Sequence, residues 1–350
     1  LSSMHQARSL GSIFLGGGTP SLFSPAAIGS FLEQVECRLP FLKNIEITME
    51  ANPGTVEHAD FDAYRLAGVN RISLGVQSFD AQSLVKLGRI HGPKEAVSAF
   101  ELINSAGLKS INVDLMHGLP GQTPAKALED IEQAIALGPN HISAYQLTLE
   151  PNTVFYRYPP EIPAEETLHA IQDIVQQTLE SAGYMQYEVS AFARDGLVCR
   201  HNLNYWRFGD YIGIGAGAHG KLTDVMGRIT RRAKKKHPAT FIATAGTPAS
   251  VNEIRCLTRE DILLEYLMNA LRLREGFTFA QATACTGISE SAFCQELAPS
   301  LDEGLLENTG LGLRCTPRGY LFIDTILAAL TDIGSMETTS AGLLAQQTAN

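Results

Sequence analysis

Short apolar segments alternate with longer amphipathic ones along the first 150 residues of the chain. Runs rich in Val, Ile, Leu and Phe indicate strands, and apolar residues at helical spacing indicate helices between them. The expected strands lie at 12–15, 44–50, 71–79, 110–120 and 141–150, and the expected helices at 26–39, 94–107 and 125–138. Strands separated by helices pair in parallel through right-handed crossovers, so the pattern predicts an α/β fold.

A weak internal repeat favours a barrel. The sequences AGVNRISLGVQ, AGLKSINVDLM and ALGPNHISAYQ each place a glycine before a turn and a strand. These glycines, Gly68, Gly107 and Gly138, are predicted to end their helices in a left-handed conformation. Repeated strand–helix units of this length favour an open or closed β/α barrel of the TIM type over a doubly wound sheet.

The pattern changes after Glu165. A helix at 165–184 leads into a stretch rich in Gly, Tyr and His, which predicts irregular structure to about residue 255. Helices near 259–272, 279–285 and 289–305, a hairpin at 308–318 and a last helix near 319–330 follow in an order that resembles a winged helix. The predicted division is a barrel at 1–190, an irregular segment at 191–257, a winged-helix-like domain at 258–333 and a disordered tail at 334–350.

Composition narrows the class of protein. The 350 residues are 45% hydrophobic and 18% charged, which suits one large domain with a smaller one. The formal net charge of −10 argues against nucleic acid as the main partner. No apolar run has the length of a membrane span, and no secretory signal opens the chain. Six cysteines without a C-x-x-C spacing indicate a reducing cytoplasm: Cys37, Cys199, Cys256, Cys285, Cys294 and Cys315.

Polar residues gather where the expected strands end. In a parallel barrel ligands bind at the carboxyl ends of the strands. Those ends carry Gly16-Gly17-Gly18-Thr19, Glu50, Gln77, Asp114 and Tyr145, and Arg89 follows one helix later. Carboxylates can bind ribose hydroxyls, a guanidinium can bind a carboxylate, and glycine carbonyls can accept from an ammonium. The set therefore suits an amino-acid nucleoside.

Each of these residues also has a structural interpretation when taken alone. Glu50 and Asp114 could cap the helices that follow them, and Arg89 could form a surface ion pair. A glycine-rich loop more often holds a phosphate or turns the chain. The recurrence of one polar residue at each successive strand end favours the ligand site.

Five motifs in the same order resemble the coproporphyrinogen-oxidase-like branch of the radical SAM proteins. They are GGGTPS at 16–21, EANPGT at 50–55, ISLGVQSF at 72–79, LGRIHG at 87–92 and DLMHGLPGQT at 114–123. The resemblance covers roughly residues 10 to 325. It implies S-adenosylmethionine (SAM) as a cofactor, with contacts from Gly17, Gly18, Thr19, Glu50, Gln77, Arg89 and Asp114.

The chain departs from this family at one point. The family holds a 4Fe-4S cluster with a C-x-x-x-C-x-x-C motif on the loop after the first barrel strand, and that motif is absent here. The expectation is that the chain begins inside the helix after that strand. It would then be truncated at its N-terminus, and its barrel would lack the first strand and the cluster loop. The 4Fe-4S cluster is thus implied only for a full-length protein.

The sequence HNLNYW at 201–206 indicates a haem site. A histidine beside two aromatic residues is a plausible axial ligand, so His201 is the candidate ligand of haem iron and Tyr205 and Trp206 are stacking partners. The alternative is a structural loop histidine. Cys199 is a candidate second haem contact. The basic run at 231–237 is interpreted as a solvated hairpin, with a grip on haem propionates as the alternative.

The H-N-x-x-Y-W motif is similar to that of the haem chaperones within this family. The resemblance implies a chaperone that binds haem and transfers it to haem-accepting proteins, among them acceptors of the respiratory chain or at a membrane periphery. The alternative is the oxygen-independent coproporphyrinogen III oxidase, an enzyme that decarboxylates propionates through a SAM-derived radical. A scaffold without cofactors is a third possibility.

Overall fold

The computed structural model describes residues 8–151 and 153–331. Contacts between residues divide the chain into two compact units. The described part of the first unit, here the barrel unit, is residues 8–201, and that of the second, the C-terminal unit, is residues 202–331. The predicted tail at 334–350 lies outside the described residues.

The barrel unit is built on one sheet, in which residues 8–201 form seven strands in the order β1-β2-β3-β4-β5-β7-β6. The first five are parallel and adjacent in chain order, whereas β7 is antiparallel to both β5 and β6. The strands are β1 (Leu10–Leu15), β2 (Phe41–Ala51), β3 (Arg71–Gln77), β4 (Ser110–His117), β5 (His141–Gln146), β6 (Met185–Glu188) and β7 (Ala191–Ala193). The sheet is open, so the predicted incomplete β/α barrel is confirmed.

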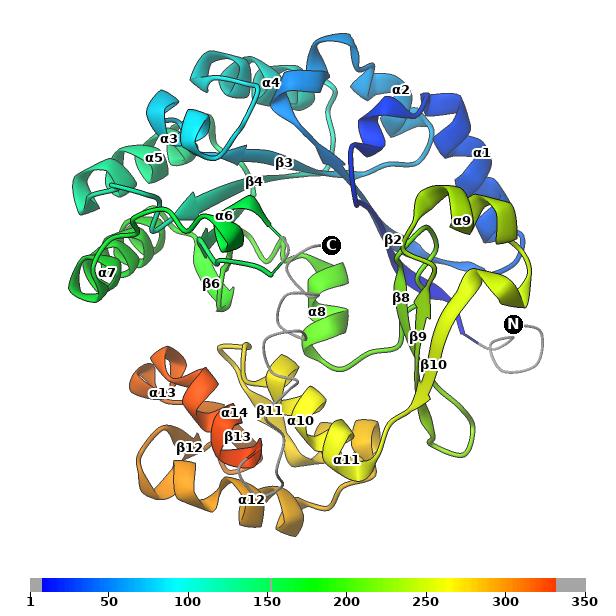
Figure 1. The fold of residues 1–350 in the computed structure, drawn as a ribbon, viewed down its shortest axis with the longest axis vertical. Coiled ribbons are helices and arrows are strands. Elements are labelled where there is room, and N and C mark those ends of the chain that lie inside the picture. The colour runs from blue at the N-terminus through cyan, green and yellow to red at the C-terminus, as the bar shows by residue number, and fades with distance from the viewer. Residues whose placement is uncertain (1–7, 152, 332–350) are drawn as a thin grey trace. The chain divides into compact units, whose positions relative to one another are not determined.

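Helices connect the parallel strands and cover the convex side of the sheet (Figure 1). They are α1 (Pro25–Glu36), α2 (Phe61–Leu66), α3 (Ala81–Lys86), α4 (Pro93–Ser105), α5 (Pro124–Leu137) and α7 (Glu165–Ser181), with short 3-10 turns at Pro20–Leu22 and Pro53–His58. The short helix α6 (Val154–Arg157) buries none of its residues and is drawn apart from them in Figure 1. Side-chain oxygens of Ser24, Asp60 and Asp80 accept from backbone N–H groups at the starts of α1, α2 and α3.

The two faces of the sheet differ in polarity. In β3, Ile72, Leu74 and Val76 are fully buried in the core beneath the helices. Successive side chains of a strand point to opposite faces, so Arg71 and Ser73 lie on the concave face. The inward positions of β2, β4 and β5 are polar in the same way. The convex face therefore supplies the hydrophobic core, and the concave face supplies functional groups.

The C-terminal unit contains two small sheets. One joins β8 (His219–Thr223), β9 (Ile229–Lys234) and β10 (Val251–Cys256), with α9 (Pro238–Thr244) between β9 and β10. The rest follows as α10 (Arg259–Ala270), β11 (Phe277–Thr278), α11 (Phe279–Thr286), α12 (Glu290–Asp302), β12 (Leu306–Asn308), β13 (Gly312–Cys315), α13 (Pro317–Leu321) and α14 (Ile323–Thr331). The order helix, strand, two helices and two strands is that of a winged helix, around the packed rings of Tyr266, Phe277 and Phe293.

The prediction of irregular structure at 191–257 was wrong. That segment contains β7, the helix α8 (Arg200–Trp206) and the sheet β8–β10. Residues 231–234 of the basic run lie in β9, where Arg231 forms an ion pair with Glu265 at 2.6 Å. Strand positions filled by Arg and Lys hide the usual alternation of apolar and polar residues. Domain boundaries remain a prediction.

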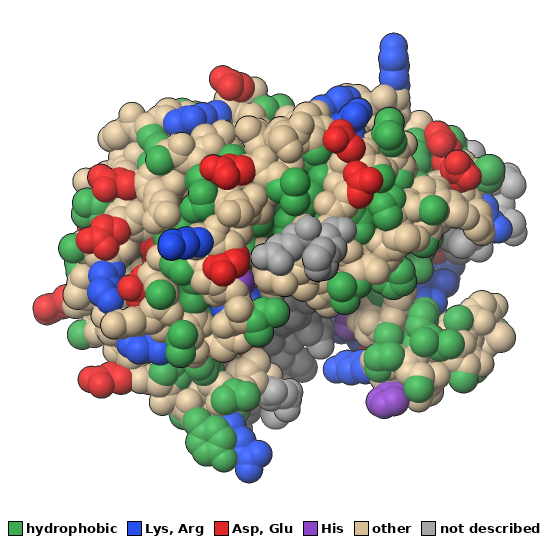
Figure 2. Space-filling model, turned by 90° about the horizontal axis from the view of Figure 1, so that it is seen from above, with side chains coloured by type: hydrophobic (Ala, Val, Ile, Leu, Met, Phe, Trp, Pro, Cys, Tyr) green, Lys and Arg blue, Asp and Glu red, His purple; other side chains and the backbone are tan. Residues whose placement is uncertain are grey.

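The helical face of the barrel unit is mixed in charge. Figure 2 looks onto the helices at the top of Figure 1 and shows Asp and Glu side chains scattered among Lys, Arg and hydrophobic ones, without a continuous basic patch on this face. None of the helices in the described ranges is both long and apolar enough to span a lipid bilayer.

Candidate functional site

A glycine loop lies at the carboxyl end of β1. Gly17 and Gly18 have φ angles of 78° and 115°, and a Cβ atom on either would meet nothing within 4 Å. Backbone conformation, rather than crowding, therefore requires glycine at both positions. The N–H of Gly17 donates to Oε2 of Glu50, 3.2 Å away, so the end of β2 holds the loop in place.

The strand-end residues predicted from the sequence lie close enough to influence one another electrostatically. Burial, with a smaller contribution from the charge of Asp114, raises the pKa of Glu50 to about 7. Burial and then Asp114 likewise raise the pKa of Tyr145, which is also affected by the charges of Arg89 and Glu50. The hydroxyl of Tyr145 donates to Oε1 of Gln77 at 2.6 Å. Glu50, Gln77, Arg89, Asp114 and Tyr145 thus form one cluster, to which a hydrogen bond ties Gly17.

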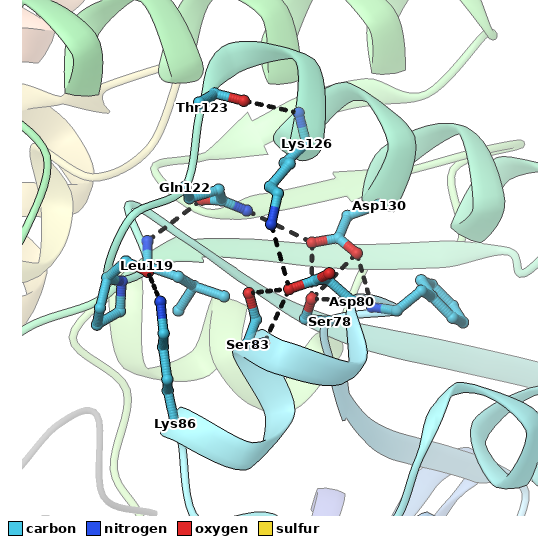
Figure 3. Close-up of polar contacts among 11 residues, drawn as sticks. Ser78, Asp80, Ser83, Lys86, Leu119, Gln122, Thr123, Lys126 and Asp130 are labelled. Atoms are coloured by element: carbon cyan, nitrogen blue, oxygen red, sulfur yellow. Dashed lines mark hydrogen bonds and ion pairs between the residues drawn. The ribbon is translucent and has the colours of Figure 1, made fainter.

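Gln77 has an unusual backbone conformation, with a φ angle of 71°. A non-glycine residue in the left-handed region costs about 1–3 kcal/mol and persists only when its surroundings hold it there. The next two residues are held by Asp130 of α5: the Ser78 hydroxyl is 2.9 Å from Oδ2, and the Phe79 N–H donates to Oδ1 at 2.6 Å. Figure 3 shows Asp130 reaching from its helix to Ser78, with Gln122 beside it.

Asp114 lies deeper on the concave face. Its carboxylate accepts from the Ser73 hydroxyl and from the Asn112 amide, both at 2.8 Å. Burial still raises the pKa of Asp114, although these two hydrogen bonds oppose the shift. Since the Asn112 amide nitrogen donates to Asp114, its oxygen accepts from Nδ1 of His141 at 2.6 Å. Nε2 of His141 then accepts from the Tyr187 hydroxyl at 2.8 Å. A hydrogen-bonded chain therefore crosses the concave face.

His201 lies on the same concave face. Its ring stacks on Phe14 of β1, with centroids 4.9 Å apart, and Ser12 Oγ is 3.4 Å from Nδ1. Glu46 of β2 accepts from the backbone N–H groups of Arg200 and His201, each at 3.0 Å, where α8 begins. Burial, assisted by the positive charge of Arg71, lowers the pKa of His201 to about 4. The alternative of a loop histidine does not hold, because His201 lies in the first turn of α8, which a barrel carboxylate caps, and its role as a haem ligand stays a prediction.

The other residues of the HNLNYW sequence belong to the C-terminal unit. The ring of Tyr205 lies 4.4 Å from that of Tyr211, and the Arg272 guanidinium lies 4.3 Å over the ring of Trp206. Trp206 is buried, and its Nε1 has no hydrogen-bond partner among the described residues. Both aromatic residues therefore pack within their own unit, and their contact with haem stays a prediction.

Sequence reasoning missed the residues that hold His201. Ser12, Phe14 and Glu46 lie at alternate, inward positions of β1 and β2. A polar residue recurring at every second position of a strand was the available signal. Cys199, predicted as a second haem contact, places its Sγ 3.6 Å from Oε1 of Glu46, and that role also stays a prediction.

Comparisons with known proteins identify the family. Residues 3–134 match the radical SAM superfamily, and residues 257–322 match the HemN C-terminal domain. The chain is 48% identical to the protein named "Heme chaperone HemW" of Escherichia coli K12, over 92% of this chain and 84% of that protein. The chain belongs to the HemW family. The HemW of Haemophilus influenzae is 47% identical to the chain, over 92% of the chain and 83% of its own length. The HemW of Bacillus subtilis is 33% identical, over 91% of the chain and 85% of its own length.

The HemW family shares its fold with a solved enzyme. Coproporphyrinogen III oxidase (HemN) from E. coli matches with a TM-score of 0.77 and 20% identity, over 93% of this chain and 79% of that one. At this identity the likeness shows the fold alone. It confirms the α/β half barrel followed by a smaller C-terminal domain.

The residues of this HemW family member do not fit a 4Fe-4S cluster. Two of the six cysteines, Cys37 and Cys256, are exposed. Cys199 lies just before α8, and Cys285, Cys294 and Cys315 lie on α11, α12 and β13. Within residues 8–151 and 153–331, no three His, Cys, Asp or Glu side chains come together as a metal site. A cluster needs several thiolates at one place, and these six cysteines do not supply them.

Proposed function

We propose that this chain is a haem chaperone, a protein that binds haem and passes it to haem-accepting proteins. Relatives at 33% to 48% identity over most of the chain carry the name of a haem chaperone. The sequence HNLNYW, the partly helical geometry of that segment and the half-buried His201 on the barrel face all support this function.

The observation that carries the proposal is the environment of His201. Only a neutral imidazole can bind iron, because protonation removes the nitrogen lone pair. Burial keeps His201 neutral far below neutral pH, and Phe14, Ser12 and Glu46 fix the ring and the backbone behind it. The contacts of His201 thus hold a neutral imidazole, the form that can ligate iron.

We propose in addition that the cluster at the strand ends binds SAM. The residues present fit this molecule: Gly17 and Gly18 leave open space over their backbone, and Nε of Arg89 is buried without a partner among the described residues. Arg89 would bind the carboxylate of SAM, Glu50 and Asp114 its polar groups, and Gln77 and Thr19 would complete the contacts. SAM would supply a methionyl sulfonium beside an adenosine group when bound.

The alternative function, oxygen-independent coproporphyrinogen III oxidase, is less supported. The relatives from E. coli, H. influenzae and B. subtilis, at 33% to 48% identity, are named as haem chaperones, whereas the oxidase structure is 20% identical. We propose haem and haem-accepting proteins as the partners, with acceptors of the respiratory chain or at a membrane periphery among them. We also propose the cytoplasm as the location, because the six cysteines form no disulfide.

A haemin titration of the purified protein tests the proposal. Wild type is expected to bind haemin with a Soret band that marks histidine ligation, and to transfer it to an apo-haem protein. His201→Ala is expected to lose that band while its far-UV spectrum stays unchanged. His169→Ala, at an exposed position of α7, is the matched control. Decarboxylation of coproporphyrinogen III by the protein, without retention of haem, would favour the oxidase instead.

A further inference from the structure

Arg71 is a buried guanidinium without a partner among the described residues. Its side chain is on the concave face at the start of β3, and the residue is 3% exposed. It forms no hydrogen bond or ion pair with the described residues, and its Nε is buried and unpaired. The largely buried cations of the C-terminal unit differ, since Lys221 pairs with Asp210 at 3.1 Å and Arg231 with Glu265 at 2.6 Å.

The carboxylates near Arg71 accept hydrogen bonds from other groups. The two oxygens of Glu46 accept from the backbone N–H groups of Arg200 and His201, and the Cys199 thiol also lies at one of them. The two oxygens of Asp114 accept from Ser73 and Asn112. Both carboxylates influence Arg71 electrostatically without contacting it. The guanidinium therefore lies near two carboxylates that accept hydrogen bonds from other donors and none from Arg71.

A buried guanidinium without a partner needs a hydrogen-bond acceptor. It carries five N–H donors in a planar fork that matches a carboxylate. Burying such a group without an acceptor costs free energy, and natural proteins pair their buried charges. The charge of Glu46 is partly balanced by the positive end of α8, so it does not fully offset that of Arg71. An additional anion on this part of the concave face would satisfy the unused donors.

We propose that Arg71 binds a carboxylate of the ligand, and that this carboxylate is a propionate of the haem whose iron His201 holds. The inference rests on the proposed function and deepens it, because it names the second point at which the protein holds haem. One point would be the iron, bound by the imidazole of His201. The other would be a bidentate pair between the guanidinium of Arg71 and a propionate.

The alternative source of a carboxylate is the methionyl group of SAM, and the position of Arg71 argues against it. Arg71 begins β3 and Gln77 ends it. Six residues of strand span about 20 Å, so Arg71 lies near the opposite end of the strand from Gln77, and of the proposed SAM contacts Asp114 is the one whose charge it feels. It is instead on the side of His201. Arg71 pairs with Thr48 of β2, Thr48 pairs with Phe14 of β1, and the ring of His201 stacks on Phe14. The charge of Arg71 also helps to lower the pKa of His201. Arg89, at the SAM end, already provides a guanidinium there.

The test compares two ligands with two variants. Haemin and its dimethyl ester, in which both propionates are blocked, are titrated into wild type, Arg71→Met and Arg71→Lys. Arg65→Met, at a surface ion pair with Asp62 on α2, is the matched control. SAM affinity is measured for all four proteins by calorimetry, and folding by far-UV circular dichroism.

Wild type is expected to bind haemin about ten- to a hundredfold more tightly than the ester. Arg71→Met should lower the affinity for haemin by the same factor and leave the affinities for the ester and for SAM unchanged. The haemin affinity of Arg71→Lys should lie between those of wild type and Arg71→Met. Arg65→Met should bind both haemin and the ester as wild type does.

Other outcomes overturn the inference. Equal binding of haemin and ester by wild type would do so without any variant, even if Arg71→Met failed to fold. An equal loss of both ligands in Arg71→Met would show a structural role, and a loss of SAM affinity alone would assign the carboxylate to SAM. If wild type binds neither haemin nor its ester, the proposed function fails first, a result distinct from the other three.

Discussion

The carboxylate of Glu46 accepts a hydrogen bond of 3.0 Å from the backbone N–H of His201, a residue 155 positions later in the chain. The second oxygen accepts from Arg200 at the same distance. Glu46 is 8% exposed, so no water competes strongly for these two N–H groups. A barrel strand thus fixes the start of the helix that carries the candidate iron ligand.

Glu46→Ala is expected to weaken haem binding. It leaves two buried N–H groups without an acceptor, each costing about 1–3 kcal/mol, and frees the first turn of α8. Glu46→Gln keeps one acceptor oxygen and should have a smaller effect. Haemin titration, with urea denaturation to record stability, measures both. Wild-type haem affinity in Glu46→Ala would show that the cap does not position His201.

Haem binding should be insensitive to mild acid. The pKa of His201, lowered by burial to about 4, keeps the imidazole neutral at pH 5, so affinity should be constant between pH 7 and pH 5. A histidine of ordinary pKa near 6.5 would lose about thirtyfold over this range. Between pH 6.5 and pH 4 the folded state binds fewer protons than the unfolded state. The stability of the protein should therefore decrease as the pH is lowered from 6.5 to 4. A haemin affinity that falls between pH 7 and pH 5 with a midpoint near 6.5 would contradict His201 as the iron ligand.

Glu50→Gln should affect stability and SAM binding in opposite directions. Burial raises the pKa of Glu50 from 4.5 to about 7, so the folded state holds an extra proton between these values and wild type loses stability as pH rises through them. The variant lacks this penalty and should be more stable than wild type at pH 8, with little difference at pH 4.5. It should bind SAM more weakly, because the carboxylate is lost as an acceptor.

Urea denaturation at the two pH values and calorimetry with SAM measure these effects. A variant that is less stable than wild type at pH 8 would show that the Glu50 carboxylate supports the fold. Unchanged SAM affinity would remove Glu50 from the proposed contacts.

Asp130→Ala should weaken SAM binding although Asp130 lies on a helix of the convex side. Without its carboxylate the Phe79 N–H and the Ser78 hydroxyl lose their acceptor, at a cost of about 1–3 kcal/mol, and the strained conformation of Gln77 loses its support. Asp130→Asn keeps an oxygen for Phe79 and should recover most of the affinity. The exposed Asp173 of α7 gives the control Asp173→Ala. Equal SAM affinity in Asp130→Ala and wild type would contradict this positioning role.

The sequence by itself determined the barrel and the cluster at its strand ends. Parallel strands bring their carboxyl ends to one edge, so Glu50, Gln77 and Asp114 had to meet once the strand–helix alternation was recognised. The motif HNLNYW likewise singles out His201, because a histidine followed by two aromatic residues is visible in the sequence alone.

Only the tertiary structure decided how these groups are held. His201 begins a helix because its N–H finds an acceptor in Glu46, and no local pattern reports a partner 155 residues away. Gln77 takes a left-handed conformation because Asp130 binds the residues that follow it. Arg71 has no hydrogen-bond partner among the described residues, while Asp114 and Glu46 near it bond to other donors. This arrangement depends on how several strands pack together, so no single segment of the sequence reports it.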